Sequence, residues 1–265
     1  MKAVATTFDR FLQNERRVVT VGLVGVISLS WLYVLTGAGM EMPNMTSTVG
    51  MMGMQTAWST SYFMLMFLMW WVMMLAMMLP SAAPMILLYS TVNRKNRERG
   101  NSFVPTGIFA AGYIIAWGVF SLLATILQWA LEEAALLSPM MASTSVWFGA
   151  GLLIAVGVYQ FTPLKQACLK HCQSPLTFLL NHWRPGRQGA VIMGLEHGVY
   201  CLGCCWMLMG LLFFGGVMNL FWIAGLAAFV LIEKILAAGA WINRISGALL
   251  IAWGVGLALS QFNVN

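Results

Sequence analysis

Long apolar stretches alternate with short polar or charged segments along this 265-residue chain. A helix needs about 20 apolar residues to cross the hydrocarbon core of a bilayer, and most of these stretches reach that length. We therefore predict an all-α polytopic transmembrane bundle, with residues 1–265 forming a single integral membrane domain. The predicted spans cover approximately residues 18–38, 62–90, 103–130, 141–161, 190–214, 217–238 and 241–260.

Composition supports this interpretation, because 60% of the residues are hydrophobic and only 8% are charged. Soluble domains carry about 25% charged residues. The net charge of +6 does not indicate nucleic-acid binding, since the basic residues do not form a soluble patch interleaved with aromatic side chains.

The basic residues predict the topology instead. All 14 Lys and Arg residues lie before the first span, in the second or fourth connection between spans, or around the sixth. The first, third and fifth connections, residues 39–61, 131–140 and 215–216, contain none. The positive-inside rule then places the N-terminus inside and the C-terminus outside. Val18 to Leu35 is longer than the apolar region of a signal peptide, so we expect an uncleaved first helix. These features fit a multi-pass protein of a bacterial inner (cytoplasmic) membrane.

The connection between the last two predicted spans is the least regular. Gly239 and Asn243 are expected to turn the chain there. Glu233 and Lys234 lie near the expected cytoplasmic end of span 217–238, where long charged side chains can pair or reach toward the headgroups.

Span 190–214 carries an unusual set of polar and sulfur-bearing residues. His197, Cys201, Cys204 and Cys205 recur at three- and four-residue spacing, which places them on one helix face, with Glu196 on its flank. Thiolate and imidazole groups suit Cu(I) or zinc, and ionisable groups inside a membrane indicate a functional site. The alternatives are redox-active thiols, a tetrahedral zinc site, or small packing residues with a hydrogen-bonded histidine.

A second cysteine cluster lies in the predicted cytoplasmic connection between spans 141–161 and 190–214. Cys168 and Cys172 are four residues apart, so a short helix would align them, and His171 is adjacent. We predict metal exchange at the cytoplasmic face by these two thiols. The alternative is a short interfacial helix with inert cysteines.

Methionine is concentrated in one part of the chain, because 14 of the 21 methionines lie between Met40 and Met85. Met40, Met42 and Met45 lie in the predicted outer loop, where thioethers could collect Cu(I). The alternative is a loop that lies on the membrane surface and uses flexible apolar side chains.

Span 62–90 carries further methionines at helical spacing. Met73, Met74, Met77 and Met78 surround its middle, at the expected depth of residues 201–205. The two sets would meet if these spans are neighbours. Such a stripe also serves simple packing, so the metal-binding interpretation of these four residues depends on that contact.

Three segments together resemble one known family. Residues 74–85 read MLAMMLPSAAPM, residues 162–172 read TPLKQACLKHC, and residues 197–206 read HGVYCLGCCW. They resemble the DUF2182 family of predicted metal-binding integral membrane proteins, and the resemblance spans approximately residues 60–260. Some members of that family are labelled copper chaperones. The resemblance implies metal binding, with copper ahead of zinc, and implies no particular reaction.

We therefore predict a membrane protein that handles Cu(I) through Met, Cys and His ligands, for transport or for delivery to a partner. The expected partners are the lipid bilayer, the metal ion, and a metallochaperone or a membrane complex. The alternatives are a membrane-embedded metal or thiol redox enzyme and an accessory subunit of a larger membrane complex. No nucleophile triad, phosphate-binding glycine loop or dinucleotide fingerprint occurs, so no catalytic residue is predicted.

Overall fold

The computed structural model describes residues 15–37, 58–98, 104–138, 141, 143–236 and 239–262. Met40, Met42 and Met45 lie outside the described residues. The described chain is helical apart from turns and one isolated bridge between Leu137 and Ser143, in agreement with the predicted all-α class. Its helices are α2 (Glu15–Leu35), α3 (Thr60–Glu98), α4 (Thr106–Glu133), α5 (Val146–Gln160), α6 (Pro163–Gln173), α7 (Pro175–His182), α8 (Gly186–Gly210), α9 (Leu212–Gly215), α10 (Leu220–Ile235) and α11 (Gly239–Phe262).

Several of these helices could cross a membrane. Within the described residues, five stretches are long and apolar enough, located in α2, α3, α4, α8 with α9, and α11. A sixth arises if α5 and α6, which meet at a bend of 63°, count as one broken span. Helix α10 has 16 residues and is shorter than the usual spanning length. The predicted number of seven spans and their orientation remain predictions.

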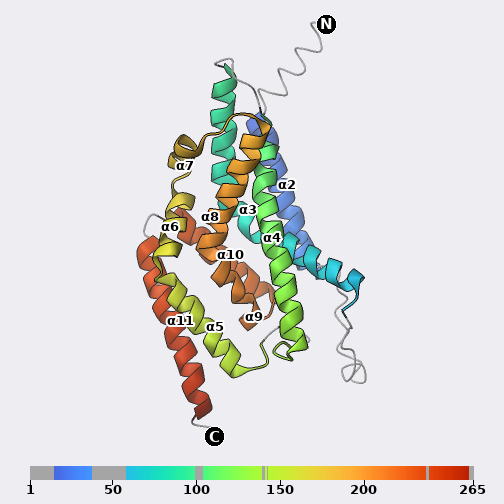
Figure 1. Ribbon diagram of the computed structural model, residues 1–265, viewed down its shortest axis with the longest axis vertical. Helices are drawn as coiled ribbons and strands as arrows, with labels where there is room; N and C mark the ends of the chain where they lie inside the picture. The colour runs from blue at the N-terminus through green and yellow to red at the C-terminus, as the bar shows by residue number, and fades with distance from the viewer. Residues whose placement is uncertain are drawn as a thin grey trace.

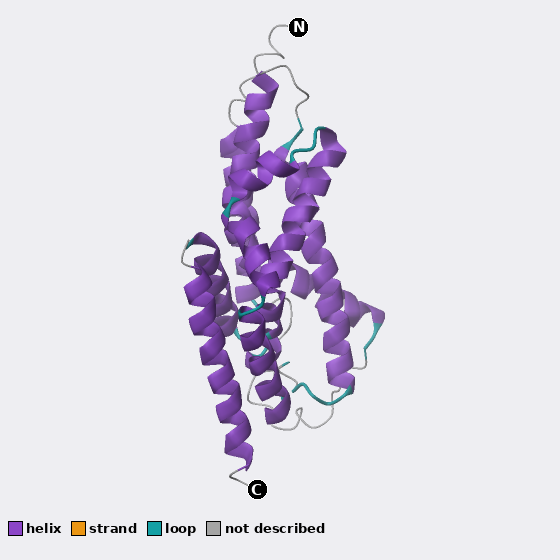
Figure 2. Cartoon of the chain, turned by 60° about the vertical axis from the view of Figure 1, so that its left-hand side comes forward, coloured by secondary structure: helices purple, strands orange, loops and turns teal. Residues whose placement is uncertain are grey.

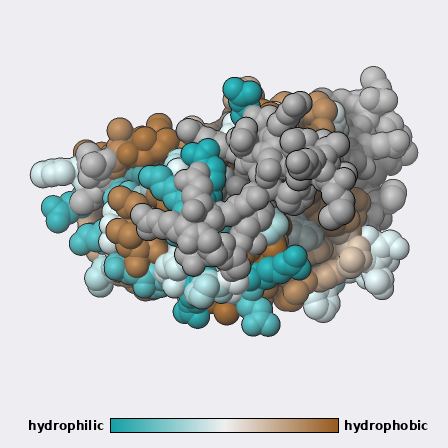
Figure 3. Space-filling model, turned by 90° about the horizontal axis from the view of Figure 1, so that it is seen from above, coloured by the Kyte–Doolittle hydropathy of each residue, from teal (hydrophilic) through white to brown (hydrophobic). Residues whose placement is uncertain are grey.

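The helices form two groups (Figure 1, Figure 2). Helices α2, α3, α4 and α8 pack together, and α5 and α11 lie side by side at the other end of the molecule. Exposed basic residues, including Arg17, Arg94 and Arg184, belong to helix ends and connections of the first group. Figure 3 views this end and shows hydrophilic side chains among its described residues, with hydrophobic ones to either side.

Glycines allow α4 and α8 to approach very closely. A Cβ atom on Gly194 would lie 2.0 Å from the carbonyl oxygen of Phe109, and one on Gly112 would lie 2.2 Å from that of Val191. Small residues at such positions let helix backbones come together, which is typical of membrane helix pairs. This contact fixes the position of α8, and hence of its cysteines, relative to α4.

Gly194→Ala is therefore expected to destabilise the protein. The added methyl group must push α4 and α8 apart, and overpacking of this kind costs about 1–3 kcal/mol. Thermal denaturation in detergent should show a lower midpoint. Gly107→Ala is the matched control, because a Cβ on that α4 glycine meets no atom within 4 Å. Equal midpoints for the two variants would contradict the close contact.

The α10–α11 connection differs from the prediction. Helix α11 begins at Gly239, so Asn243 lies within a helix and is fully buried instead of turning the chain. Glu233 and Lys234 are also buried, at 0% and 7% exposure, so they do not extend to the surface, and the pairing alternative holds for Glu233, which forms an ion pair with Lys165. These side chains are buried because α10 packs against α3, α6 and α8, which enclose this end of the helix.

Candidate metal centre

Helix α8 presents its cysteines to the interior of the bundle. Cys201, Cys204 and Cys205 are buried, as is His197, in agreement with the helix face that their spacing predicts. The Sγ atoms of Cys204 and Cys205 donate to the carbonyl oxygen of Cys201, at 3.0 and 2.9 Å. The three thiols of α8 therefore lie within one turn, and all of them are free.

Helix α6 adds a fourth thiol to this group. It begins at Pro163, where the Thr162 hydroxyl accepts a hydrogen bond from the Lys165 amide, and it packs against α8. The Cys172 Sγ lies 4.0 Å from the Cys204 Sγ. The two cysteine clusters predicted from the sequence are therefore joined. We call Cys172, Cys201, Cys204 and Cys205 the thiol cluster.

Cys168 lies beside the thiol cluster and fills a different space. Its Sγ packs against Gly203, where a Cβ atom would lie only 2.5 Å away. His171 points away from the cluster, since its ring stacks on Tyr200 with centroids 4.1 Å apart. The α6 segment thus contributes one thiol to the cluster and uses the other to pack against α8.

Helices α3 and α4 complete the surroundings of the thiols. The Cys205 Sγ lies 3.8 Å from the Met78 Sδ, so α3 and α8 do meet at this depth. The Tyr113 hydroxyl of α4 lies 3.1 Å from the Cys201 Sγ and donates to the Met78 carbonyl oxygen at 3.3 Å. Helix α3 continues through Pro80 and Pro84.

The other candidate methionines of α3 are buried without a recorded contact to the thiols. Met73, Met74 and Met77 have exposures of 1%, 0% and 1% and belong to the hydrophobic core. Met78 contacts the thiol cluster through Cys205.

A lysine that sequence reasoning did not assign to the site contacts the cluster directly. The Lys234 Nζ lies 2.8 Å from the Cys201 Sγ and 3.1 Å from the Ser81 Oγ. Its neighbour Glu233 forms a fully buried ion pair with Lys165, at 2.6 Å. The sequence did contain a feature that could have indicated this role. Glu233 and Lys234 interrupt an apolar run, and ionisable residues in such runs are candidates for functional sites.

His197 lies close to the thiols along α8 and is enclosed by aromatic rings. Its ring centroid is 5.8 Å from that of Tyr113 and 5.5 Å from that of Phe178. Within the described chain, its buried Nδ1 atom has no hydrogen-bond partner. The Nδ1 atom of His197 could therefore bind a metal ion without breaking a hydrogen bond.

Glu196 faces a different part of the molecule. Its carboxylate accepts a hydrogen bond from the Arg184 Nη2 at 2.6 Å and lies 3.3 Å from the His182 Nδ1. It is partly exposed and no contact joins it to the thiol cluster in the described residues. Glu196 therefore ties α8 to the segment that precedes it.

The donor set suits a soft metal ion. Sulfur ligands from Cys and Met select Cu(I), whereas carboxylates suit harder ions, and the thiol cluster with Met78 offers only sulfur. Across the described residues, no three His, Cys, Asp or Glu side chains are already arranged around one point. The Cys204 and Cys205 thiols would have to leave the Cys201 carbonyl before they could bind an ion.

The family model described as PpoB2, copper chaperone, matches residues 67–257, which include the thiol cluster, Met78 and Lys234. No significant match was found among curated proteins or among solved structures. The match supports the copper-chaperone label carried by the resemblance above, and the DUF2182 name remains a prediction. Because the match covers most of its length, the chain belongs to the PpoB2 copper chaperone family.

Proposed function

We propose that this protein is a membrane-embedded Cu(I) chaperone that holds its cargo at the thiol cluster. One observation carries the proposal. Buried thiols from α6 and α8 come together beside the Met78 thioether, with the Lys234 ammonium 2.8 Å from the Cys201 sulfur. Copper handling follows from the family, and the ligand residues are our assignment.

Charge balance is compatible with Cu(I) at this position. Two thiolates and one Cu(I) carry a net charge of −1, which the Lys234 ammonium neutralises. Since an uncompensated charge is costly in a low-dielectric interior, the neutral combination is favoured.

The surrounding side chains have defined tasks in this proposal. Ser81 accepts a hydrogen bond from the Lys234 ammonium and thereby keeps it next to Cys201. The Tyr113 hydroxyl contacts both the Met78 carbonyl oxygen and the Cys201 sulfur, and so links α3 to α8. Met78 supplies a neutral sulfur, and His197 supplies an imidazole one turn away on α8.

The location and the route are further parts of the proposal. The chain as a whole would form one domain in a bacterial inner membrane, as the distribution of basic residues predicts. Met40, Met42 and Met45 would collect Cu(I) outside, and a metallochaperone or a membrane complex would receive it. Glu196, Met73, Met74, Met77 and Cys168 would act by shaping or lining the route.

The experiment is to purify the full chain anaerobically in detergent, load it with Cu(I), and measure bound metals by mass spectrometry. Wild type is expected to retain near-stoichiometric copper that resists a moderate chelator. The variant Cys172→Ala/Cys201→Ala/Cys204→Ala/Cys205→Ala should lose that tightly held copper, because it removes every thiolate of the cluster.

Cys168→Ala provides the matched control, since it removes a neighbouring cysteine that faces Gly203 instead of the cluster. It should keep its tightly held copper. A folded wild-type protein that takes up no Cu(I) would contradict the proposal. If the metal-free protein instead cycled between free thiols and a Cys172–Cys204 disulfide, thiol chemistry would be favoured, because those sulfurs are 4.0 Å apart.

A further inference from the structure

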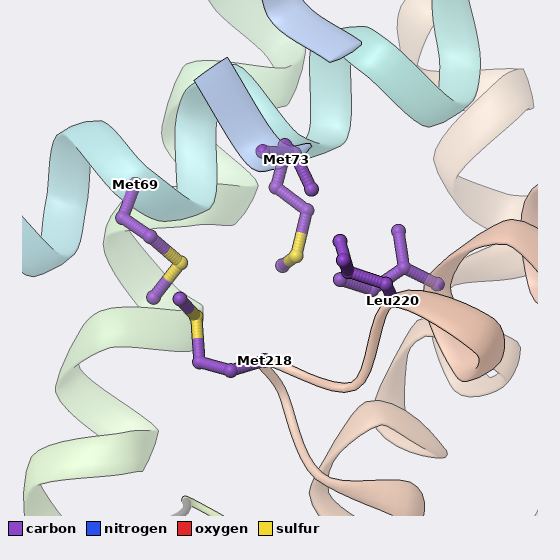
Figure 4. Close-up of a pocket in the computed structure, with 6 residues that line it drawn as sticks. Met69, Met73, Met218 and Leu220 are labelled. Carbon is purple, nitrogen blue, oxygen red and sulfur yellow. The ribbon is translucent and has the colours of Figure 1, made fainter. Parts of the chain in front are cut away.

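A second sulfur-lined space lies away from the thiol cluster. Val34 of α2, Met69 and Met73 of α3, and residues of the turn before α10 enclose a small cavity. Figure 4 shows the side chains of Met69, Met73 and Met218 pointing into it from two different elements. The remaining lining residues, Leu220 and Ile223, are apolar, so among the described residues of the lining the thioether sulfurs are the only side-chain groups that could bind a metal.

The three methionines are positioned by well-defined backbone. Met69 and Met73 are four residues apart on α3, so they lie on one helix face, and each is only 1% exposed. Met218 belongs to the turn between α9 and α10. Two of the three methionines therefore come from one face of α3, and the third comes from the turn before α10.

Local hydrogen bonds hold the turn that carries Met218. Gly216 adopts a φ of +91°, which glycine tolerates without strain, and the Val217 amide donates to the Met141 carbonyl at 3.4 Å. The Asn219 side chain caps α10 by accepting from two amides of its first turn. Met218 lies between these anchors, so its thioether faces α3 on a fixed backbone.

Thioether sulfur is a soft, uncharged ligand that selects Cu(I) and its analogue Ag(I) over hard or borderline cations. We propose that Met69, Met73 and Met218 form a second, all-thioether Cu(I) site. The identity of the cargo rests on the proposed function above. The site itself rests on the cavity and its three sulfurs.

The two sites differ in charge and therefore in the strength of binding. Three thioethers leave the charge of Cu(I) unbalanced, whereas the thiol cluster offers thiolates to neutralise it. The thioether site should accordingly bind Cu(I) more weakly and release it more easily. A relay needs such graded sites, because an ion must be able to leave each site as well as enter it.

Helix α3 connects the two sites. Met73 lines the cavity and Met78 contacts Cys205, so five residues of one helix, or about 7.5 Å of rise, separate them. Val34 lies one residue before the end of α2, and Met40 follows shortly after in the sequence. The lining residues Val34 and Met69 therefore flank the methionines at positions 40–54 in the sequence.

The test compares Met69→Leu/Met73→Leu/Met218→Leu with a control, Met64→Leu/Met85→Leu/Met209→Leu, whose methionines do not line the cavity. Leucine is close to methionine in volume and is well tolerated in cores, so both triple variants should fold. Each is titrated anaerobically with Cu(I), in the wild-type background and in the four-alanine thiol-cluster background. X-ray absorption at the copper edge reports the ligand atoms.

In the four-alanine background, weakly bound copper with sulfur-only ligation should persist, and the Met69/Met73/Met218 variant should bind about one equivalent less of it. In the wild-type background, that variant should likewise lose about one equivalent of weak copper and keep the tight copper. Unchanged titrations, or an equal loss in the control variant, would overturn the thioether site and leave the thiol-cluster proposal standing. Wild type that binds no copper would overturn both.

Discussion

Lys165→Met is expected to lower the free energy of unfolding by about 3–5 kcal/mol, because it leaves Glu233 buried without its counter-ion. Both side chains of this ion pair are 0% exposed, and their charged atoms are 2.6 Å apart. The pair joins α6 to α10, the helices that carry Cys172 and Lys234. Losing it should therefore loosen the candidate metal centre as well as the fold.

Denaturation midpoints in detergent would measure this effect. The double variant Lys165→Met/Glu233→Leu is the decisive comparison, because replacing a buried ion pair by apolar residues of similar size is often neutral. It should recover most of the stability lost by Lys165→Met. A single variant as stable as wild type, or a double variant no better than the single one, would show that the pair is not isolated from water.

Lys234→Met is expected to weaken Cu(I) binding by about 10–100-fold, the range typical of groups that support a metal site without binding the metal. The substitution keeps the length of the side chain and removes the positive charge beside the Cys201 sulfur. The thiolates and Cu(I) would then keep a net negative charge in the interior. Competition against a Cu(I) chelator of known affinity would measure the change.

Lys170→Met is the matched control for that experiment. Lys170 lies on α6 and its side chain is exposed, so its loss should leave the affinity unchanged. Equal weakening in both variants would point to a general effect of charge on the protein surface. An unchanged affinity in Lys234→Met would remove the charge-balance argument for Cu(I).

The secondary structure of the centre could be predicted from the sequence, whereas its assembly could not. Apolar periodicity and three-to-four spacing place Cys201, Cys204 and Cys205 on one face of a helix. The joining of Cys172 to that face depends on how α6 packs against α8. Nothing local to residues 163–173 encodes that contact, so the sequence pattern leaves two clusters where the structure has one.

Glu196 lies in a different environment from His197, its neighbour in the sequence. Glu196 precedes His197, yet successive residues of a helix point about 100° apart. His197 faces the interior, and Glu196 faces Arg184 and His182. Conversely, Lys234 is far from the cysteines in sequence and meets Cys201 only through the packing of α10, which explains why an end-of-span position suggested a solvent-facing lysine.

The bend between α5 and α6 connects the thiol cluster to the α5–α11 helix pair. Only two residues separate α5 from α6 at the 63° bend, and α5 packs mainly on α11, where Gly157 and Gly254 bring the two helices together. A change in tilt of the α5–α11 pair must therefore move α6, and with it Cys172 relative to Cys204. Because spanning helices adjust their tilt to bilayer thickness, the proposed function predicts that bilayer thickness affects the geometry of the proposed copper ligands.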